Sequence, residues 1–209
     1  FVFNMLTRSR RITFDNLGER DGEFAALVQQ RFADTVAGGE AVDSAPAMFQ
    51  PVRIGDMELV NRIMLSPMDM YSAVDGLPGE FHLVHLGSKA LGGAGLLMTE
   101  MTCVSPEARI TLGCPGLWTD EQRDAWARVT SFVHANSAGK IGVQVGHSGR
   151  KGSTKLMWDG IDEPLESGNW EPIGPSPLPY GDGCHVPREA TREDMDVVIA
   201  DFVASAERA

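Results

Sequence analysis

Polar side chains follow three short apolar segments of this chain, and they are the first candidates for chemistry. Residues 63–65 are apolar, Ser66-Pro67 ends the run, and Asp69 follows between two methionines. A carboxylate at the end of a buried strand costs free energy unless a partner stabilises it. Asp69 is therefore either a group that acts on a ligand or one that accepts hydrogen bonds from the backbone N–H groups of a neighbouring turn.

Gln144 raises a similar question in the apolar segment 140–146, where it stands between Val143 and Val145. We expect this amide to be buried, so that its donors and its acceptor all need partners. Backbone groups of the core would satisfy it, and so would the donor–acceptor edge of a planar heterocycle. The residue type alone favours neither interpretation.

Two pairs of basic residues complete the candidates. His82 and His85 lie three residues apart on a predicted helix, but no third ligand stands at a suitable spacing. A structural or cofactor-adjacent role is therefore favoured over a metal site. Arg150 and Lys151 follow the segment 140–146 and form either a solvated pair or a site for an anionic ligand.

The elements that must position these residues alternate between strand and helix. The pattern predicts strands at 63–66, 95–101 and 140–146, and helices at 80–91, 119–139 and 191–209. Such alternation indicates βαβ units and a parallel sheet. Ligands of a parallel sheet gather beyond the carboxyl ends of the strands, which is where the candidate residues stand.

Two of the predicted helices carry finer signals. The helix at 119–139 begins with a capping box formed by Thr119 and Gln122. Its apolar stripe consists of Trp126, Val129 and Val133. Gly139 fits a C-cap at its end. The last helix has an apolar face of five residues: Met195, Val198, Ile199, Phe202 and Ala206.

The length of the chain limits the fold. A TIM (β/α)8 barrel takes about 250 residues, whereas 209 − 46 = 163 residues follow residue 46. We therefore expect an α/β protein that is either a small open sheet or the N-terminal part of a TIM (β/α)8 barrel. A helical tail or linker precedes it, because residues 24–36 have apolar residues at helical spacing and residues 37–46 are small and polar. We place the boundary near residue 46, before a predicted hairpin at 52–60.

Composition excludes several classes of protein. The net charge of −11 argues against a general surface for nucleic acid or an anionic membrane. No apolar stretch reaches the ~20 residues that cross a bilayer. Three cysteines without a C-x-x-C pair argue against a disulfide framework or a zinc site. We expect a cytoplasmic protein with a small-molecule substrate, and homo-oligomers remain compatible with the sequence.

Four motifs resemble a known family. In order, they are NRIMLSPMDMYS, GLLMTEMTCVSPEARIT, GLWTDEQ and IGVQVGHSGRKG. Over residues 47–209 they resemble the first half of the Old Yellow Enzyme family of NADH:flavin oxidoreductases. The resemblance implies the N-terminal part of a TIM barrel, non-covalent FMN, and hydride transfer from NAD(P)H through the flavin to an activated C=C bond.

The resemblance also assigns roles to individual residues. It places FMN against Ser66, Pro67, Met68 and Asp69, the isoalloxazine beside the backbone of Met101, the pyrimidine edge on Gln144 and the substrate before Tyr71. Many members of the family have Thr or Cys where Asp69 stands. Asp69 therefore aligns with a family position but differs from it in residue type. The catalytic residues of the family follow the fourth strand. We therefore assign none here and expect this chain alone to be incomplete and inactive.

The first 46 residues suggest a fusion. The stretch MLTRSRRITFDNL resembles the tail of an FAD-dependent aromatic hydroxylase. Residues 1–46 would then be the end of an upstream FAD monooxygenase domain plus a linker, and residues 47–209 an incomplete FMN-binding barrel domain. Bifunctional salicylyl-CoA 5-hydroxylase/oxidoreductases and 2-aminobenzoyl-CoA monooxygenase/reductases have this order. The comparison implies an aromatic acyl-CoA substrate and a role in aromatic degradation.

Two other classes compete with a flavin reductase. One is a non-catalytic α/β fragment or binding module without flavin. The other is a phosphate-binding TIM-barrel isomerase or aldolase, which needs a lysine base or a carboxylate at a strand end. Asp69 and Glu100 are the carboxylates on offer, and this class is the least favoured.

Overall fold

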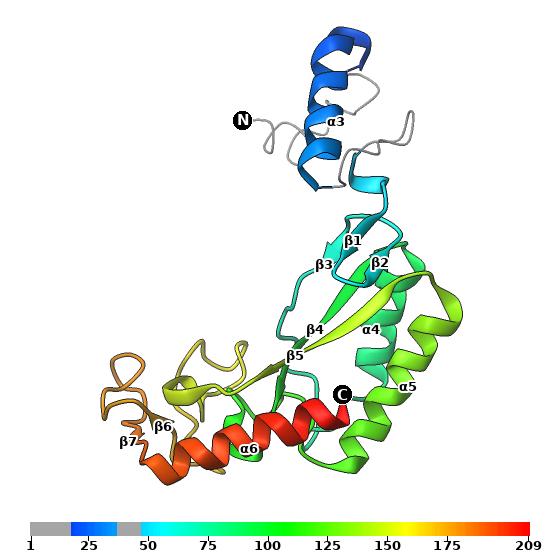
Figure 1. Cartoon of the computed structure of the whole chain (residues 1–209). Coiled ribbons are helices and arrows are strands. Elements are labelled where there is room, and N and C mark those ends of the chain that lie inside the picture. Colours follow the sequence, from blue (N-terminus) through cyan, green and yellow to red (C-terminus); the bar gives the residue numbers. More distant parts are fainter. Residues whose placement is uncertain (1–17, 37–46) are drawn as a thin grey trace. The chain divides into compact units, whose positions relative to one another are not determined.

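The structure is a computed structural model that describes residues 18–36 and 47–209. The chain divides into two compact units, Phe1–Ile63 and Met64–Ala209 (Figure 1). The stretch that resembles a hydroxylase tail and the linker at 37–46 lie outside the described residues. The domain assignment made from the sequence therefore stays a prediction.

Among the described residues of the first unit, the main elements are helix α3 and a hairpin. Helix α3 spans Gly22–Val36 and is preceded by Asp21, whose Oδ1 accepts a hydrogen bond from the Phe24 N–H at 2.9 Å. A single 3-10 turn follows at Ala47–Phe49. Strands β1, Val52–Ile54, and β2, Met57–Leu59, pair antiparallel around Gly55, which has a φ of 59°. Glycine adopts this left-handed conformation without steric cost, and the hairpin predicted at 52–60 is confirmed.

The second unit is built on a parallel sheet. Strands β3, Met64–Leu65, β4, Leu96–Cys103, and β5, Lys140–Gly146, lie in the order β3-β4-β5. Met64 pairs with Leu96, which in turn pairs with Lys140, so all three strands run in the same direction. The three predicted strands are confirmed, and their carboxyl ends meet at one edge of the sheet.

Two helices cover the same face of this sheet (Figure 1). Helix α4, Glu80–Leu91, joins β3 to β4, and α5, Asp120–Asn136, joins β4 to β5. Their shared core with the strands consists of Leu86, Ala90, Leu97, Leu117, Trp126, Val129 and Val133. Sequential parallel strands with successive helices on one face are the arrangement of a barrel, whereas a doubly wound sheet has helices on both faces.

The ends of α5 confirm one prediction and correct another. Thr119 Oγ1 accepts from the Gln122 N–H at 3.2 Å, and Gln122 Oε1 accepts from the Thr119 N–H at 3.1 Å, which completes the predicted capping box. The predicted C-cap at Gly139 is wrong, because the helix is capped at Ser137. A Cβ on Gly139 would lie 2.6 Å from the Ala94 carbonyl oxygen, so glycine is needed there for close backbone approach.

Helix α6, Arg192–Arg208, packs with a face that matches the predicted one only in part. Met195 and Ile199 are exposed, whereas Phe202 packs against the core and Ser205 is buried. The reason is a polar anchor: Ser205 Oγ donates to the Leu117 carbonyl at 3.1 Å, and Arg208 pairs with Asp120 at 3.1 Å. These contacts set the rotation of the helix and leave part of its apolar face in solvent.

The connections on the carboxyl side of the strands contain short elements of their own. They are two 3-10 turns, Pro106–Ala108 and Gly149–Lys151, and the parallel pair β6, Ile173–Gly174, and β7, Arg188–Glu189. No strand was predicted from the sequence at β6 or β7, which are two residues each. Within the part of the chain that the structure describes, no helix has the length and apolar character to cross a membrane.

Candidate active site at the strand ends

Three hydrogen bonds, given in both directions, join the segment after β3 to β4. Asp69 Oδ1 accepts from the Met101 N–H at 3.2 Å. Glu100 Oε2 accepts from the Met70 N–H at 2.9 Å and from the Tyr71 N–H at 3.3 Å. Each carboxylate thus binds the backbone beside the other. We call residues 68–71 together with Glu100 and Met101 the carboxylate clasp.

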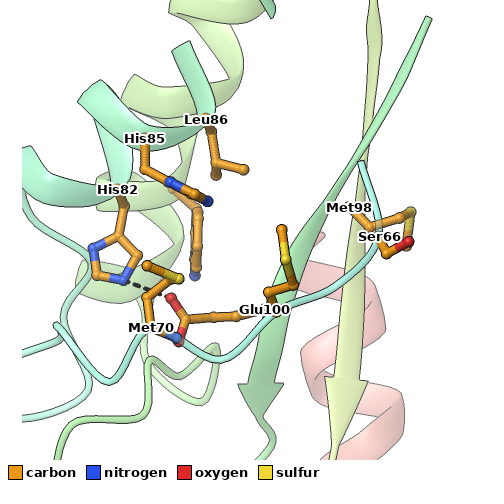
Figure 2. A pocket seen from close by; sticks show the side chains of 9 residues that line it. Ser66, Met70, His82, His85, Leu86, Met98 and Glu100 are labelled. Atoms are coloured by element: carbon orange, nitrogen blue, oxygen red, sulfur yellow. Dashed lines mark hydrogen bonds and ion pairs between the residues drawn. The ribbon is translucent and has the colours of Figure 1, made fainter. Parts of the chain in front are cut away.

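His82 of α4 stands behind Glu100. Its Nδ1 accepts a hydrogen bond from the Gly79 N–H at 3.1 Å, which assigns the ring proton to Nε2. Nε2 lies 3.1 Å from Glu100 Oε1, but the two groups are not aligned as a full hydrogen bond (Figure 2). Trp126 meets the imidazole edge-to-face at 5.7 Å between ring centroids. His82 and Glu100 are both buried, at 2% and 6% exposed.

The cavity beside this pair is too small for a substrate. Its volume of about 10 Å³ has room for about one water molecule. Its walls come from the segment after β3 and from β4, α4 and α5, and they include Ser66, Met70, His85, Leu86 and Met98 (Figure 2). His85 stacks on Phe81 at 5.8 Å, and burial lowers the pKa of its imidazole. Within residues 18–36 and 47–209 no three His, Cys, Asp or Glu side chains gather to hold a metal.

The surroundings of the clasp raise the pKa of both Asp69 and Tyr71. Burial raises the pKa of Asp69, the Met101 N–H opposes this, and the nearby Glu100 carboxylate reinforces it. Burial, with Asp69 as the second cause, raises the pKa of the Tyr71 phenol to about 12. Tyr71 therefore keeps its proton at neutral pH and can donate a hydrogen bond.

Tyr71 also has an unusual backbone. Its φ of 50° lies in the left-handed region that residues with a Cβ seldom adopt. A Cβ on Gly113 would lie 2.4 Å from the Tyr71 carbonyl oxygen, so the neighbouring loop approaches the backbone of Tyr71 closely. The ring contacts Trp158 edge-on at 6.5 Å between centroids. Trp158 was not singled out from the sequence, which gives no sign of this contact across 87 residues.

Gln144 is exposed, and its predicted burial is wrong. It lies on β5, an edge strand of the sheet. Ile141 packs against the core under the helices, so Gly142, Gln144 and Gly146 point to the opposite face. The Gln144 N–H donates to Thr99 Oγ1 at 3.2 Å, at a break in the β4–β5 register. The side-chain amide remains open to solvent.

Two glycines flank Gln144 on its face of the sheet. A Cβ on Gly142 would lie 2.8 Å from Met98 Sδ, and one on Gly146 would lie 2.6 Å from Met101 Cγ. Two flexible methionine side chains thus lie over bare backbone on either side of an exposed amide. A planar heterocycle with a donor–acceptor edge fits this surface, because the amide can both donate and accept while the methionines give way.

The other predicted residues lie around the same edge. Ser66 and Met68 are exposed and Pro67 is half-buried. Lys151 pairs with Asp162 at 3.1 Å, and Arg150 donates to Ser176 Oγ at 3.2 Å, so both cations have protein partners. The sequence analysis named Glu100 only as a possible base and did not foresee the clasp. The signal available was an acidic residue directly after Thr99 in an otherwise apolar strand.

Comparison with known proteins identifies the family. The sequence profile of the NADH:flavin oxidoreductase / NADH oxidase family matches residues 47–209. This protein belongs to that family. It is 36% identical over 200 residues to an NADH:flavin oxidoreductase of Gibberella zeae, covering 93% of this chain and 47% of the relative. An NADPH dehydrogenase of Listeria monocytogenes is 37% identical over 164 residues, covering 78% and 44%.

A solved structure agrees with the sequence relatives. Morphinone reductase superposes with a TM-score of 0.66 at 29% identity, covering 81% of this chain and 46% of that one. The predicted resemblance to Old Yellow Enzyme proteins and to their barrel fold is therefore confirmed at the level of family and fold. The chain spans about half the length of each of these three proteins.

Proposed function

We propose that this chain supplies the first part of the FMN site of an Old Yellow Enzyme-type oxidoreductase. NAD(P)H would be the electron donor and an activated carbon–carbon double bond the acceptor. The observation that carries the proposal is the exposed amide of Gln144, set on bare backbone between Gly142 and Gly146. The family match disfavours a binding module without flavin.

The chemistry that bound FMN supplies is transfer of a hydride from NAD(P)H to the double bond. The residues of this chain would bind and orient. Gln144 would hydrogen-bond the pyrimidine edge, Met101 would meet the ring through its backbone, and Ser66, Pro67, Met68 and Asp69 would line it. Tyr71, whose phenol keeps its proton, would face the substrate as a neutral donor. The Met101 N–H donates a hydrogen bond to Asp69. It can donate to FMN only if that hydrogen bond breaks.

An FMN titration tests this proposal. The intact protein is stripped of flavin and titrated with FMN while flavin fluorescence is followed. Gln144→Leu removes the amide and should raise Kd about tenfold, because one or two hydrogen bonds of about 1 kcal/mol each are lost. Lys140→Leu, at the opposite end of β5, is the matched control and should leave Kd unchanged. An unchanged Kd in Gln144→Leu would remove the observation on which the proposal rests.

We further propose that the reductase is part of an aromatic acyl-CoA monooxygenase/reductase. The support is the resemblance of residues 5–17 to the tail of an aromatic hydroxylase, and these residues lie outside the described ones. Such a protein would release both FAD and FMN on denaturation, and chromatography of the released flavins separates the two. FMN without FAD would argue for a reductase that stands alone.

A further inference from the structure

Glu100 is a buried carboxylate that has no role in the function proposed for this chain. We propose that Glu100, oriented by His82, is a positioning residue that fixes residues 68–71 and so places Asp69 and Tyr71 at the flavin site. The inference rests on the proposed function, since the site it positions is the one proposed for FMN. Neither residue needs to touch the cofactor.

Glu100 is the main tether of the segment after β3. Only two residues of β3 pair with β4, so the sheet itself stops holding the chain at Leu65. Beyond that point, Glu100 accepts hydrogen bonds from the N–H groups of Met70 and Tyr71. The next backbone hydrogen bond runs from the Ala73 N–H to the Gly113 carbonyl, at 3.0 Å. The left-handed conformation of Tyr71 costs on the order of 1 kcal/mol and needs such a contact to persist.

His82 explains why the Glu100 carboxylate faces the segment. The Gly79 N–H fixes the imidazole tautomer at the start of α4, so the protonated Nε2 lies 3.1 Å from Oε1. A buried carboxylate needs partners on both oxygens. With Oε1 beside His82, Oε2 is left for the two amides (Figure 2). The pair thereby connects helix α4 to the loop that would line the cofactor.

Glu100→Gln tests the arrangement with little change of shape. A glutamine has one carbonyl oxygen and one NH2 group. If its oxygen accepts from the Met70 and Tyr71 amides, its NH2 faces the Nε2–H of His82. If it flips, its NH2 faces the two amides instead. Either way donors oppose donors inside a buried site, and the segment 68–71 loses its fixed position.

Two measurements on the intact protein are needed. The first is hydrogen exchange at the Met70 and Tyr71 amides, measured without flavin. The Ala73 amide is the internal reference, because it donates to the Gly113 carbonyl and not to Glu100. The second is the Kd of FMN. We expect protection at Met70 and Tyr71 in the wild type, loss of that protection in Glu100→Gln, and a Kd raised about tenfold. Glu121→Gln, an exposed carboxylate on α5, should change neither measurement.

His82→Phe is the second variant, and it keeps a ring beside Trp126. It removes the donor that orients Glu100 and should raise Kd in the same direction. The outcomes separate the two proposals. No FMN binding by the wild type would overturn the proposed function and this inference with it. Wild-type binding with an unchanged Kd in both folded variants would overturn the inference alone. Should neither variant fold, Met70 and Tyr71 amides that exchange freely in the wild type would also overturn it.

Discussion

At the scale of single residues, Asp69 and Glu100 exchange hydrogen bonds with each other's backbone. This arrangement resolves part of the question that Asp69 raised in the sequence. Its carboxylate does accept a backbone N–H, but from Met101 at the end of the next strand and not from a neighbouring turn. Burial raises the pKa of Asp69, the Met101 N–H lowers it in part, and the nearby Glu100 carboxylate raises it. Asp69 thus meets both another carboxylate and the proposed cofactor surface.

The raised pKa of Asp69 predicts a pH-dependent stability. The folded state holds the proton more tightly than the unfolded state, so the wild type loses stability as pH rises from the ordinary pKa of 3.8 through the raised value. Asp69→Asn does not titrate and keeps an acceptor for the Met101 N–H. Its stability relative to the wild type should therefore increase with pH across that window. Urea unfolding at several pH values measures the difference.

The control for that series is Asp159→Asn, which also removes one negative charge but from an exposed loop position. A stability difference for Asp69→Asn that stays constant from acidic to neutral pH would contradict the raised pKa.

The charge of Asp69 also predicts an effect on the flavin potential. An ionised carboxylate near the ring opposes the negative charge gained on reduction, so it lowers the midpoint potential. Asp69→Asn should raise the potential of bound FMN by more than about 15 mV, equivalent to about 0.7 kcal/mol for two electrons. A spectroscopic redox titration measures this shift. A smaller shift would mean that Asp69 acts on the backbone alone.

At the scale of elements, local signals predicted the helices and strands well, and tertiary contacts decided the rest. The capping box at Thr119 and the stripe of Trp126, Val129 and Val133 are local, and both were found as expected. The face of α6 was predicted only in part, because Ser205 and Arg208 anchor it to residues 88 positions away. The burial of Gln144 was mispredicted because it depends on what covers β5, which the period of a strand cannot reveal.

The cap of α5 supplies a prediction at this scale. Thr119→Ala removes the side-chain acceptor of the Gln122 N–H and should lower the free energy of unfolding by about 1 kcal/mol. Thr130→Ala, in the middle of the same helix, should cost less, because alanine has the higher helix propensity. Thermal or urea unfolding compares the two. Equal losses would mean that the cap contributes nothing specific.

At the scale of the whole molecule, strand order and helix placement match a barrel, and the carboxyl ends of three strands hold the candidate site. Fold and family could be predicted from the four motifs. The carboxylate clasp could not be predicted, because its contacts join residues about 30 positions apart. In these contacts a side chain accepts a hydrogen bond from the backbone, and the two side chains do not pair with each other. The family match covers residues 47–209, and the proteins it resembles are about twice as long.

The central claim is that this chain helps to form an FMN site, and the flavin content of the intact protein tests it most directly. The protein is purified, its visible spectrum is recorded, and the supernatant after denaturation is analysed by chromatography. The predicted result is flavin absorbance that leaves with the supernatant and contains FMN. A colourless protein that takes up no FMN on reconstitution would contradict the claim.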